Sequence, residues 1–278
     1  MGYNPRICKI WDNAYRYMRN IKLTIAYDGT NYAGWQIQNS PQSSVYSPQK
    51  KTIQEILEKT LQKILQEEVK VIGSGRTDAG VHALSQVANF RTRSLLSLAV
   101  IQKALNSLLP KDISIKGISF VDNDFHACCR AKSKVYRYII FNGSFPSVFL
   151  YRYSWHISFN LNNALMQQEA KSLVGSHDFK SFCASHTGAK TTVRIIKKVS
   201  FTTELCKPDI AKGKLLIIEV EADGFLYNMM RNIIGTLVEI GRGRFEKGSI
   251  KRILHLKDRA MAGPRAPAQG LFLAQVKY

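Results

Sequence analysis

The stretch Ile21-Lys-Leu-Thr-Ile-Ala-Tyr27 alternates apolar and polar residues and runs into the turn pair Asp28-Gly29. This alternation is typical of a β-strand with one face in the core. Further along, Thr52-Ile-Gln-Glu55 fits a helix capping box, and apolar residues after it recur on one helical face. The Ser-, Gln- and Pro-rich stretch Asn39–Lys50 is predicted to be a surface loop between the two.

The same kinds of pattern continue through the chain and repeat their order. The first half adds two strands, a helix that stops before Pro110 and a closing strand, predicted at 69–72, 85–92, 98–109 and 113–121. In the second half the patterns predict strands at 134–141, 191–203, 214–222 and 271–276, and helices at 161–174 and 225–240. The succession β-α-β-β-α-β thus occurs twice. It predicts an α+β protein of two ferredoxin-like units, each with helices on one face of an antiparallel sheet.

Three segments are expected from these patterns. Residues 1–17 carry aromatic and basic side chains without periodicity, and we expect a floppy N-terminal extension, with an ordered arm as the alternative. An N-terminal α+β domain is predicted at 18–125, and a C-terminal α+β domain at 126–278.

The charge of the chain points to a polyanionic partner. Lys and Arg number 40 against 20 Asp and Glu, which gives a net charge of +20 over 278 residues. Such an excess favours nucleic acid as the partner, with an anionic membrane surface as the weaker alternative. The five cysteines are scattered, with no metal-ligand spacing, and no apolar run is long enough to span a bilayer. These features predict a soluble intracellular protein with reduced thiols.

The glycine-rich segment at 73–80 invites a phosphate-loop interpretation, which its residues exclude. Val81 and His82 stand where a phosphate loop needs Lys and Ser or Thr, and Asp78 stands where a dinucleotide fingerprint needs glycine. What remains is a sharp turn that presents Arg76 and Asp78 close together. The alternative is a turn in which Asp78 only caps backbone amides.

Two further positions allow a functional and a structural interpretation. Tyr136 and Tyr138 share one face of a strand with basic neighbours, a pattern that suits stacking on unpaired bases and equally suits core packing. Arg231 lies in the apolar helix Phe225–Ile240, where a guanidinium needs a carboxylate partner such as Asp78 or must reach the surface.

Taken together, five segments resemble the tRNA pseudouridine synthase A family, in the same order and over about Met18 to Tyr278. The segments are Tyr27-Asp-Gly-Thr-x-Tyr-x-Gly-Trp35, Gly75-Arg-Thr-Asp-Ala-Gly-Val-His-Ala83, Lys134-Val-Tyr-Arg-Tyr138, Phe225-x-Tyr-Asn-Met-Met-Arg-Asn-Ile-Ile-Gly235 and Ala266-Pro-Ala-Gln-Gly-Leu-Phe-Leu273. The second of these is highly specific.

The resemblance implies a role for each candidate residue. Asp78 would be the catalytic aspartate, Arg231 its ion-pair partner, Arg76 an RNA-engaging residue, Tyr136 the ring that stacks on the base, and Leu271 an apolar contact to it. Members of the family isomerise uridine to pseudouridine at positions 38–40 of the tRNA anticodon stem-loop. The resemblance further implies a cytoplasmic homodimer without cofactor or metal, whose two units are joined around a central basic cleft.

Three features depart from the family pattern. Residues 1–17 extend beyond its usual start, and the loop Asn39–Lys50 is longer than typical. Cys128 stands where members often have arginine, a role that Arg130 would have to cover. Two rival functions are a non-catalytic RNA-binding module and a glycosidic hydrolase, although a hydrolase normally needs two carboxylates and the loop offers one.

Overall fold

The computed structural model describes residues 18–37, 51–184, 189–207 and 210–278. The N-terminal extension at 1–17 and the loop Asn39–Lys50 lie outside the described residues. The chain divides into two compact units, Met1–Ala131 and Lys132–Tyr278.

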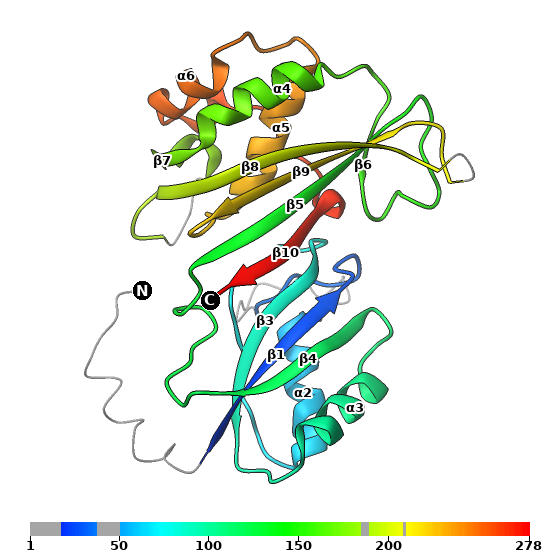
Figure 1. The fold of residues 1–278 in the computed structure, drawn as a ribbon, viewed down its shortest axis with the longest axis vertical. Helices are drawn as coiled ribbons and strands as arrows, with labels where there is room; N and C mark the ends of the chain where they lie inside the picture. Colours follow the sequence, from blue (N-terminus) through cyan, green and yellow to red (C-terminus); the bar gives the residue numbers. More distant parts are fainter. Residues whose placement is uncertain (1–17, 38–50, 185–188, 208–209) are drawn as a thin grey trace, which may run out of the picture. The chain divides into compact units, whose positions relative to one another are not determined.

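The first unit is a four-stranded antiparallel sheet with two helices on one face (Figure 1). The strands lie in the order β4-β1-β3-β2, so the first strand of the unit is central and pairs with the last. Alternation along β1 has the predicted effect, because Ile21, Leu23 and Ile25 are fully buried. In chain order the elements are β1 (Arg19–Tyr27), α2 (Ile53–Leu65), β2 (Ile72–Gly73), β3 (His82–Thr92), α3 (Leu98–Leu108) and β4 (Ile113–Val121).

Each helix of this unit begins at a side-chain cap. The Thr52 hydroxyl accepts the Glu55 amide at 3.2 Å, and the Ser97 hydroxyl accepts the Val100 amide at 3.3 Å. Such caps satisfy amides that the first helical turn leaves without a partner. The capping box predicted for α2 is therefore present on its Thr52 side.

The second unit repeats this arrangement and extends it. Its strands lie in the order β10-β5-β9-β8-β7, and β6 adds a short parallel pairing with β5. Helices α4, α5 and α6 lie on one side of the sheet (Figure 1). The elements are β5 (Ser133–Asn142), β6 (Trp155–Ile157), α4 (Asn163–Ala170), β7 (Gly175–Asp178), β8 (Val193–Leu205), β9 (Lys214–Ala222), α5 (Met229–Gly241), α6 (Ser249–Leu256) and β10 (Leu271–Lys277).

The predicted α+β class and the succession of elements are confirmed, with four local differences. The strand predicted at 69–72 is reduced to β2, because residues 69–71 are not part of a strand. The sequence patterns missed β6, β7 and α6. The helix predicted at 161–174 is shorter, because α4 ends at Ala170 and a 3₁₀ turn follows. The predicted start of α5 at Phe225 is wrong: Asn228 adopts a left-handed conformation with φ of 60°, so the helix begins at Met229. Asparagine tolerates this conformation better than most residues.

Candidate active site

The loop between β2 and β3 carries Arg76 and Asp78 on either side of an anchored residue. Thr77 is 5% exposed, and its hydroxyl shares a hydrogen bond of 2.8 Å with the Tyr27 hydroxyl. The Thr77 carbonyl accepts the Trp35 amide at 3.0 Å. Arg76 is exposed and Asp78 is half-buried. The loop is thus fixed at its centre, while the side chains before and after Thr77 retain access to solvent.

Two glycines after β1 let the chain approach this loop closely. Gly34 has φ of +93°, and a Cβ there would lie 2.5 Å from the Thr77 carbonyl oxygen. A Cβ on Gly29 would lie 2.0 Å from the carbonyl oxygen of Val81. Both distances exclude a side chain. The glycines of the Tyr27–Trp35 segment therefore serve as the surface against which the Asp78 loop packs.

The entry to the loop is tied to β3 by a buried polar pair. Gln86 donates through Nε2 to the Gly75 carbonyl at 2.8 Å, and its Oε1 accepts the Ser74 hydroxyl at 2.7 Å. The Ser74 amide donates to the Val87 carbonyl at 2.7 Å. Because buried polar groups are costly unless satisfied, this pairing holds the loop in one conformation.

The tyrosine beneath the loop stays protonated. Burial raises the pKa of Tyr27 well above its ordinary value, and the hydrogen bond with Thr77 offsets only part of that rise. A neutral phenol both donates and accepts, which suits its place between hydroxyl and amide groups.

In the second unit, β5 presents Tyr136 and Tyr138 to different neighbours. The Tyr136 ring is 7% exposed and meets the Phe225 ring edge to face, with 4.8 Å between centroids. Tyr138 is fully buried, and its hydroxyl donates to the Pro267 carbonyl at 2.8 Å. Leu271 lies opposite Tyr138 in the pairing of β10 with β5, and Leu273 lies opposite Tyr136. The structural interpretation therefore holds for Tyr138. Tyr136 is also buried, and its ring packs against Phe225.

Arg231 is the one residue of α5 that is not buried. Its Nε donates to the Ala266 carbonyl at 2.7 Å, and Nη1 lies 3.4 Å from the Asn228 amide oxygen. The Ala266 amide in turn donates to the Arg231 carbonyl at 3.1 Å. These acceptors hold the guanidinium stem beside the segment that leads to β10.

That segment, Gly263–Pro267, packs directly on α5. A Cβ on Gly235 would lie 1.7 Å from the Pro264 carbonyl oxygen, so only glycine fits there. The Gly263 amide donates to the Thr236 hydroxyl at 2.9 Å. Because the same segment bonds Arg231 and Tyr138 and then continues to Leu271, one stretch of chain links these three predicted or neighbouring positions.

The structure thus gathers the predicted residues within each unit. Arg76 and Asp78 lie in one loop of the first unit. In the second unit Tyr136 lies in β5, Arg231 in α5 and Leu271 at the start of β10. The predicted pairing of Arg231 with Asp78 would join the two units, and it remains a prediction. Sequence reasoning missed Phe225 and the Ala266 carbonyl as partners; the only signal for Phe225 was its place at the start of a family motif.

The departure at Cys128 lies in an exposed turn. The Cys128 and Cys129 amides both donate to His126 Nδ1 at 3.2 Å, and Arg130 forms an ion pair with Asp124. That Arg130 takes over the role of the arginine found in family members remains a prediction.

The described part of the chain has neither a candidate metal site nor a helix that could cross a membrane. Over residues 18–37, 51–184, 189–207 and 210–278, no group of three or more His, Cys, Asp or Glu side chains could hold a metal ion. Over the same ranges, every helix is too short or too polar to cross a membrane.

The chain was compared with protein families and with curated proteins. A family model described as tRNA pseudouridine synthase matches residues 23–130 and 170–278. A protein of Acetivibrio thermocellus named tRNA pseudouridine synthase A is 45% identical over 261 residues, which cover 94% of this chain and 100% of that protein. Proteins of the same name from Thermoanaerobacter sp. (strain X514) and Pelobacter propionicus are each 43% identical, with the same coverage.

Proposed function

We propose that this chain, which belongs to the tRNA pseudouridine synthase family, isomerises uridine to pseudouridine at positions 38–40 of the tRNA anticodon stem-loop, with Asp78 as its catalytic residue. The family membership carries the reaction: relatives matched over their whole length and over 94% of this chain are 43–45% identical to it. The chain is accordingly an isomerase that acts on tRNA.

The build of the Asp78 loop supports the catalytic role. Thr77 is held through both its hydroxyl and its carbonyl, so the carboxylate that follows it is carried on a rigid base. Catalytic groups gain from such pre-organisation, because a misplaced group loses rate steeply. Asp78 is half-buried, which fits a group that must contact a bound nucleotide.

The reaction exchanges one ribose bond for another. The bond between N1 of uracil and C1′ of ribose breaks, the ring rotates, and C5 bonds to C1′. The proton that C5 loses is balanced by the proton that N1 gains. Ionised Asp78 begins this sequence either as the nucleophile or as a base towards the sugar.

The other predicted residues serve the base before and during rotation. A stacked uridine must first leave its helix, at a cost of a few kcal/mol. We propose that the Tyr136 ring stacks on the extruded uracil, that Arg76 engages the RNA and that Leu271 gives the base an apolar contact. The exposure of Arg76 and the edge-to-face support of Tyr136 by Phe225 fit these roles.

We propose that Arg231 pairs with Asp78 and keeps it ionised in a pocket that excludes water. The position of Arg231 supports this pairing, because Arg231 is the one residue of α5 that is not buried. We also propose that the enzyme works without cofactor, as a homodimer in the cytoplasm, where its tRNA substrate is found.

The test is to incubate the protein with unmodified tRNA and to map pseudouridine by nucleotide. Pseudouridine should form only at positions 38–40, and replacing a uridine there by cytidine should remove the signal at that position alone. Release of free uracil would indicate a glycosidic hydrolase instead, and binding without any product would indicate an RNA-binding module.

A further inference from the structure

A cavity of about 710 Å³ lies in the second unit, outside the candidate active site. It is bordered by the end of β7, the start of β8 and the segment that follows α6. Among the described residues, four basic and two acidic side chains line it: Lys180, Lys190, Lys257, Arg259, Asp178 and Asp258. Its charged lining is therefore predominantly positive.

The Asp178 carboxylate is bonded to neighbouring groups in the cavity wall. Its Oδ1 accepts the Thr192 hydroxyl at 2.5 Å and the Lys180 amide at 3.1 Å, and its Oδ2 lies 3.2 Å from Lys257 Nζ. The hydrogen bond from Thr192, assisted by Lys257, holds the pKa of Asp178 below its usual range. Asp178 therefore stays ionised, and Lys257 is the one cation with which it forms an ion pair among the described residues.

Arg259 is anchored entirely by uncharged oxygens. Its guanidinium donates to the carbonyls of Ala262 and Gly263 at 3.2 and 3.0 Å, and to the Asn232 amide oxygen at 3.0 Å. Within the described part of the chain it makes no ion pair. Burial, and then the nearby charge of Arg265, lower the pKa of Arg259. A half-buried arginine held rigid without a carboxylate is well prepared to receive an anion.

Lys180 and Lys190 add two more cations. Both side chains line the cavity and both residues are exposed. Neither ammonium group pairs with a carboxylate among the described residues. Three of the four cations are thus available to a ligand, which calls for an anion with several acceptor oxygens.

The cavity adjoins the part of α5 that carries Arg231. Arg259 bonds Asn232, the residue after Arg231, and the Ala184 amide at the cavity donates to the Tyr227 carbonyl at 3.2 Å. An extended polyanion bound near Arg231 would therefore reach the cavity within the same unit.

We propose that this cavity binds a phosphate group of the tRNA sugar–phosphate backbone, next to the nucleotide that is modified. The inference rests on the proposed function, because that function supplies the polyanion. Phosphate contacts position an RNA without reading its sequence, so the cavity would hold different tRNAs in one register.

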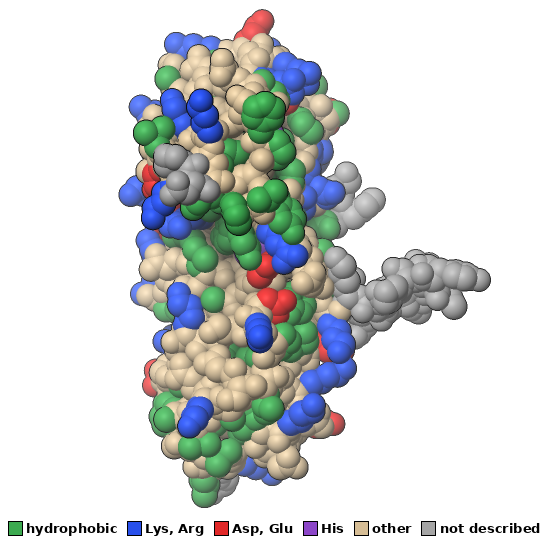
Figure 2. Space-filling model, turned by 90° about the vertical axis from the view of Figure 1, so that its right-hand side faces the viewer, with side chains coloured by type: hydrophobic (Ala, Val, Ile, Leu, Met, Phe, Trp, Pro, Cys, Tyr) green, Lys and Arg blue, Asp and Glu red, His purple; other side chains and the backbone are tan. Residues whose placement is uncertain are grey.

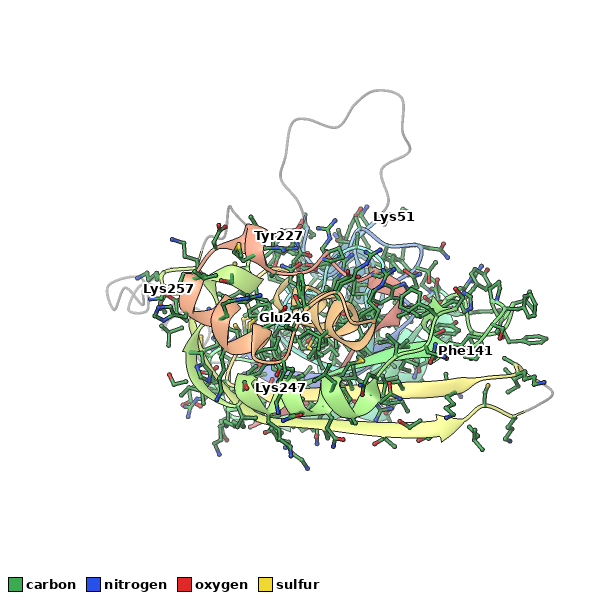
Figure 3. The ribbon with its side chains drawn as sticks, turned by 90° about the horizontal axis from the view of Figure 1, so that it is seen from above. Lys51, Phe141, Tyr227, Glu246, Lys247 and Lys257 are labelled. Carbon is green, nitrogen blue, oxygen red and sulfur yellow. The ribbon has the colours of Figure 1, made fainter. Side chains whose placement is uncertain are left out.

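The test compares two double variants that lose the same charge. Lys180→Met with Lys190→Met removes two cations from the cavity. Lys247→Met with Lys251→Met removes two exposed lysines of the same unit that do not line it. Lys247 lies just before α6 and Lys257 just after it, well apart (Figure 3). Affinity for unmodified tRNA is measured for both variants over a range of salt concentrations.

We expect the cavity variant to bind tRNA roughly tenfold more weakly than the control variant. Its plot of log affinity against log salt should be shallower by about one unit, the value for one lost phosphate contact. Equal affinities and slopes for the two variants would overturn the proposal, because the lysines would then act only through net charge.

A second experiment distinguishes binding of an RNA phosphate from binding of a free phosphate compound. Inorganic phosphate is titrated into the wild type and the cavity variant without tRNA, and the melting temperature is followed. Stabilisation of the wild type alone, together with tRNA affinity equal to that of the control, would reassign the cavity to a free phosphate compound. Pseudouridine formation by the wild type is measured separately, so failure of the proposed function is distinguishable from failure of the cavity.

Discussion

Asp78 owes its place to the residue before it. Thr77 meets Tyr27 through its hydroxyl and Trp35 through its carbonyl, so the carboxylate next to it is positioned from two sides. Motif recognition pointed to Asp78, but these partners were not predicted. Contacts between segments 50 residues apart depend on how the chain folds back, which spacing along the sequence does not record.

Tyr136 is expected to act through its ring. Removing a base stack costs about 1–3 kcal/mol, so Tyr136→Leu should slow turnover by roughly five- to hundredfold. Tyr136→Phe keeps both the stack and the edge-to-face contact with Phe225, and it should retain most of the activity. Single-turnover rates on unmodified tRNA measure this, with melting temperatures as the check on folding. A leucine variant of normal rate would make Tyr136 a core residue only.

Arg231 is expected to act through its charge. Arg231→Met keeps most of the apolar stem and removes the cation. A carboxylate that loses a nearby cation is protonated more easily, so the acid limb of the pH–rate profile should move to higher pH. Affinity for tRNA should change little. An unshifted acid limb with full activity would contradict the pairing of Arg231 with Asp78.

Among the elements, helix α5 and the segment Gly263–Pro267 pack directly on one another. Gly235 admits the Pro264 carbonyl, and Thr236 caps the Gly263 amide. The two family motifs that contain Gly235 and Ala266 are therefore two sides of one contact. The Tyr27–Trp35 and Gly75–Ala83 motifs stand in the same relation, through Gly29 and Gly34.

The buried Tyr138 of strand β5 leads to a prediction of how stability depends on pH. Burial raises the pKa of Tyr138, as it does that of Tyr27. Above about pH 10 the unfolded chain releases these phenolic protons while the folded chain keeps them, so the unfolded state binds fewer protons and stability falls as pH rises. Urea unfolding between about pH 8 and 11 should show this fall, and Tyr138→Phe should make it less steep by up to about 1.4 kcal/mol per pH unit. An identical slope in the variant would contradict the prediction.

Which elements could be predicted follows from how local their causes are. The alternation of β1 and the cap of α2 lie in adjacent residues, and both predictions are confirmed. Helix α6 has no side-chain cap of its own; Glu169 of α4, 4% exposed, accepts the Gly248 and Ile250 amides instead. Strand β7 is short and polar and is defined by its pairing with β8. A helix start or an edge strand that depends on residues elsewhere in the chain leaves no local sequence pattern.

Across the whole molecule, positive charge dominates. The net charge is +20, and Figure 2 shows Lys and Arg side chains spread over the visible face with few acidic ones. A tRNA-modifying enzyme uses such a surface for phosphate contacts that bind without sequence preference. The excess of positive charge could be predicted from the composition. The cavity around Arg259 could not, because its lining comes from segments far apart in the chain.

Affinity for tRNA should therefore depend strongly on salt. If about five phosphates are neutralised, affinity should fall roughly 10²-fold between about 50 and 200 mM salt. Filter binding with unmodified tRNA over that range measures the slope. A nearly flat dependence would mean that the excess charge serves another purpose.

The most direct measurement compares the wild type with Asp78→Asn on the same unmodified tRNA, recording pseudouridine formed and tRNA bound in one preparation. The asparagine keeps the shape of the loop but can act neither as nucleophile nor as base. We predict that pseudouridine formation falls by at least about 10³-fold, while the melting temperature and tRNA affinity stay close to those of the wild type. Turnover within tenfold of the wild type would contradict the assignment of Asp78 as the catalytic residue.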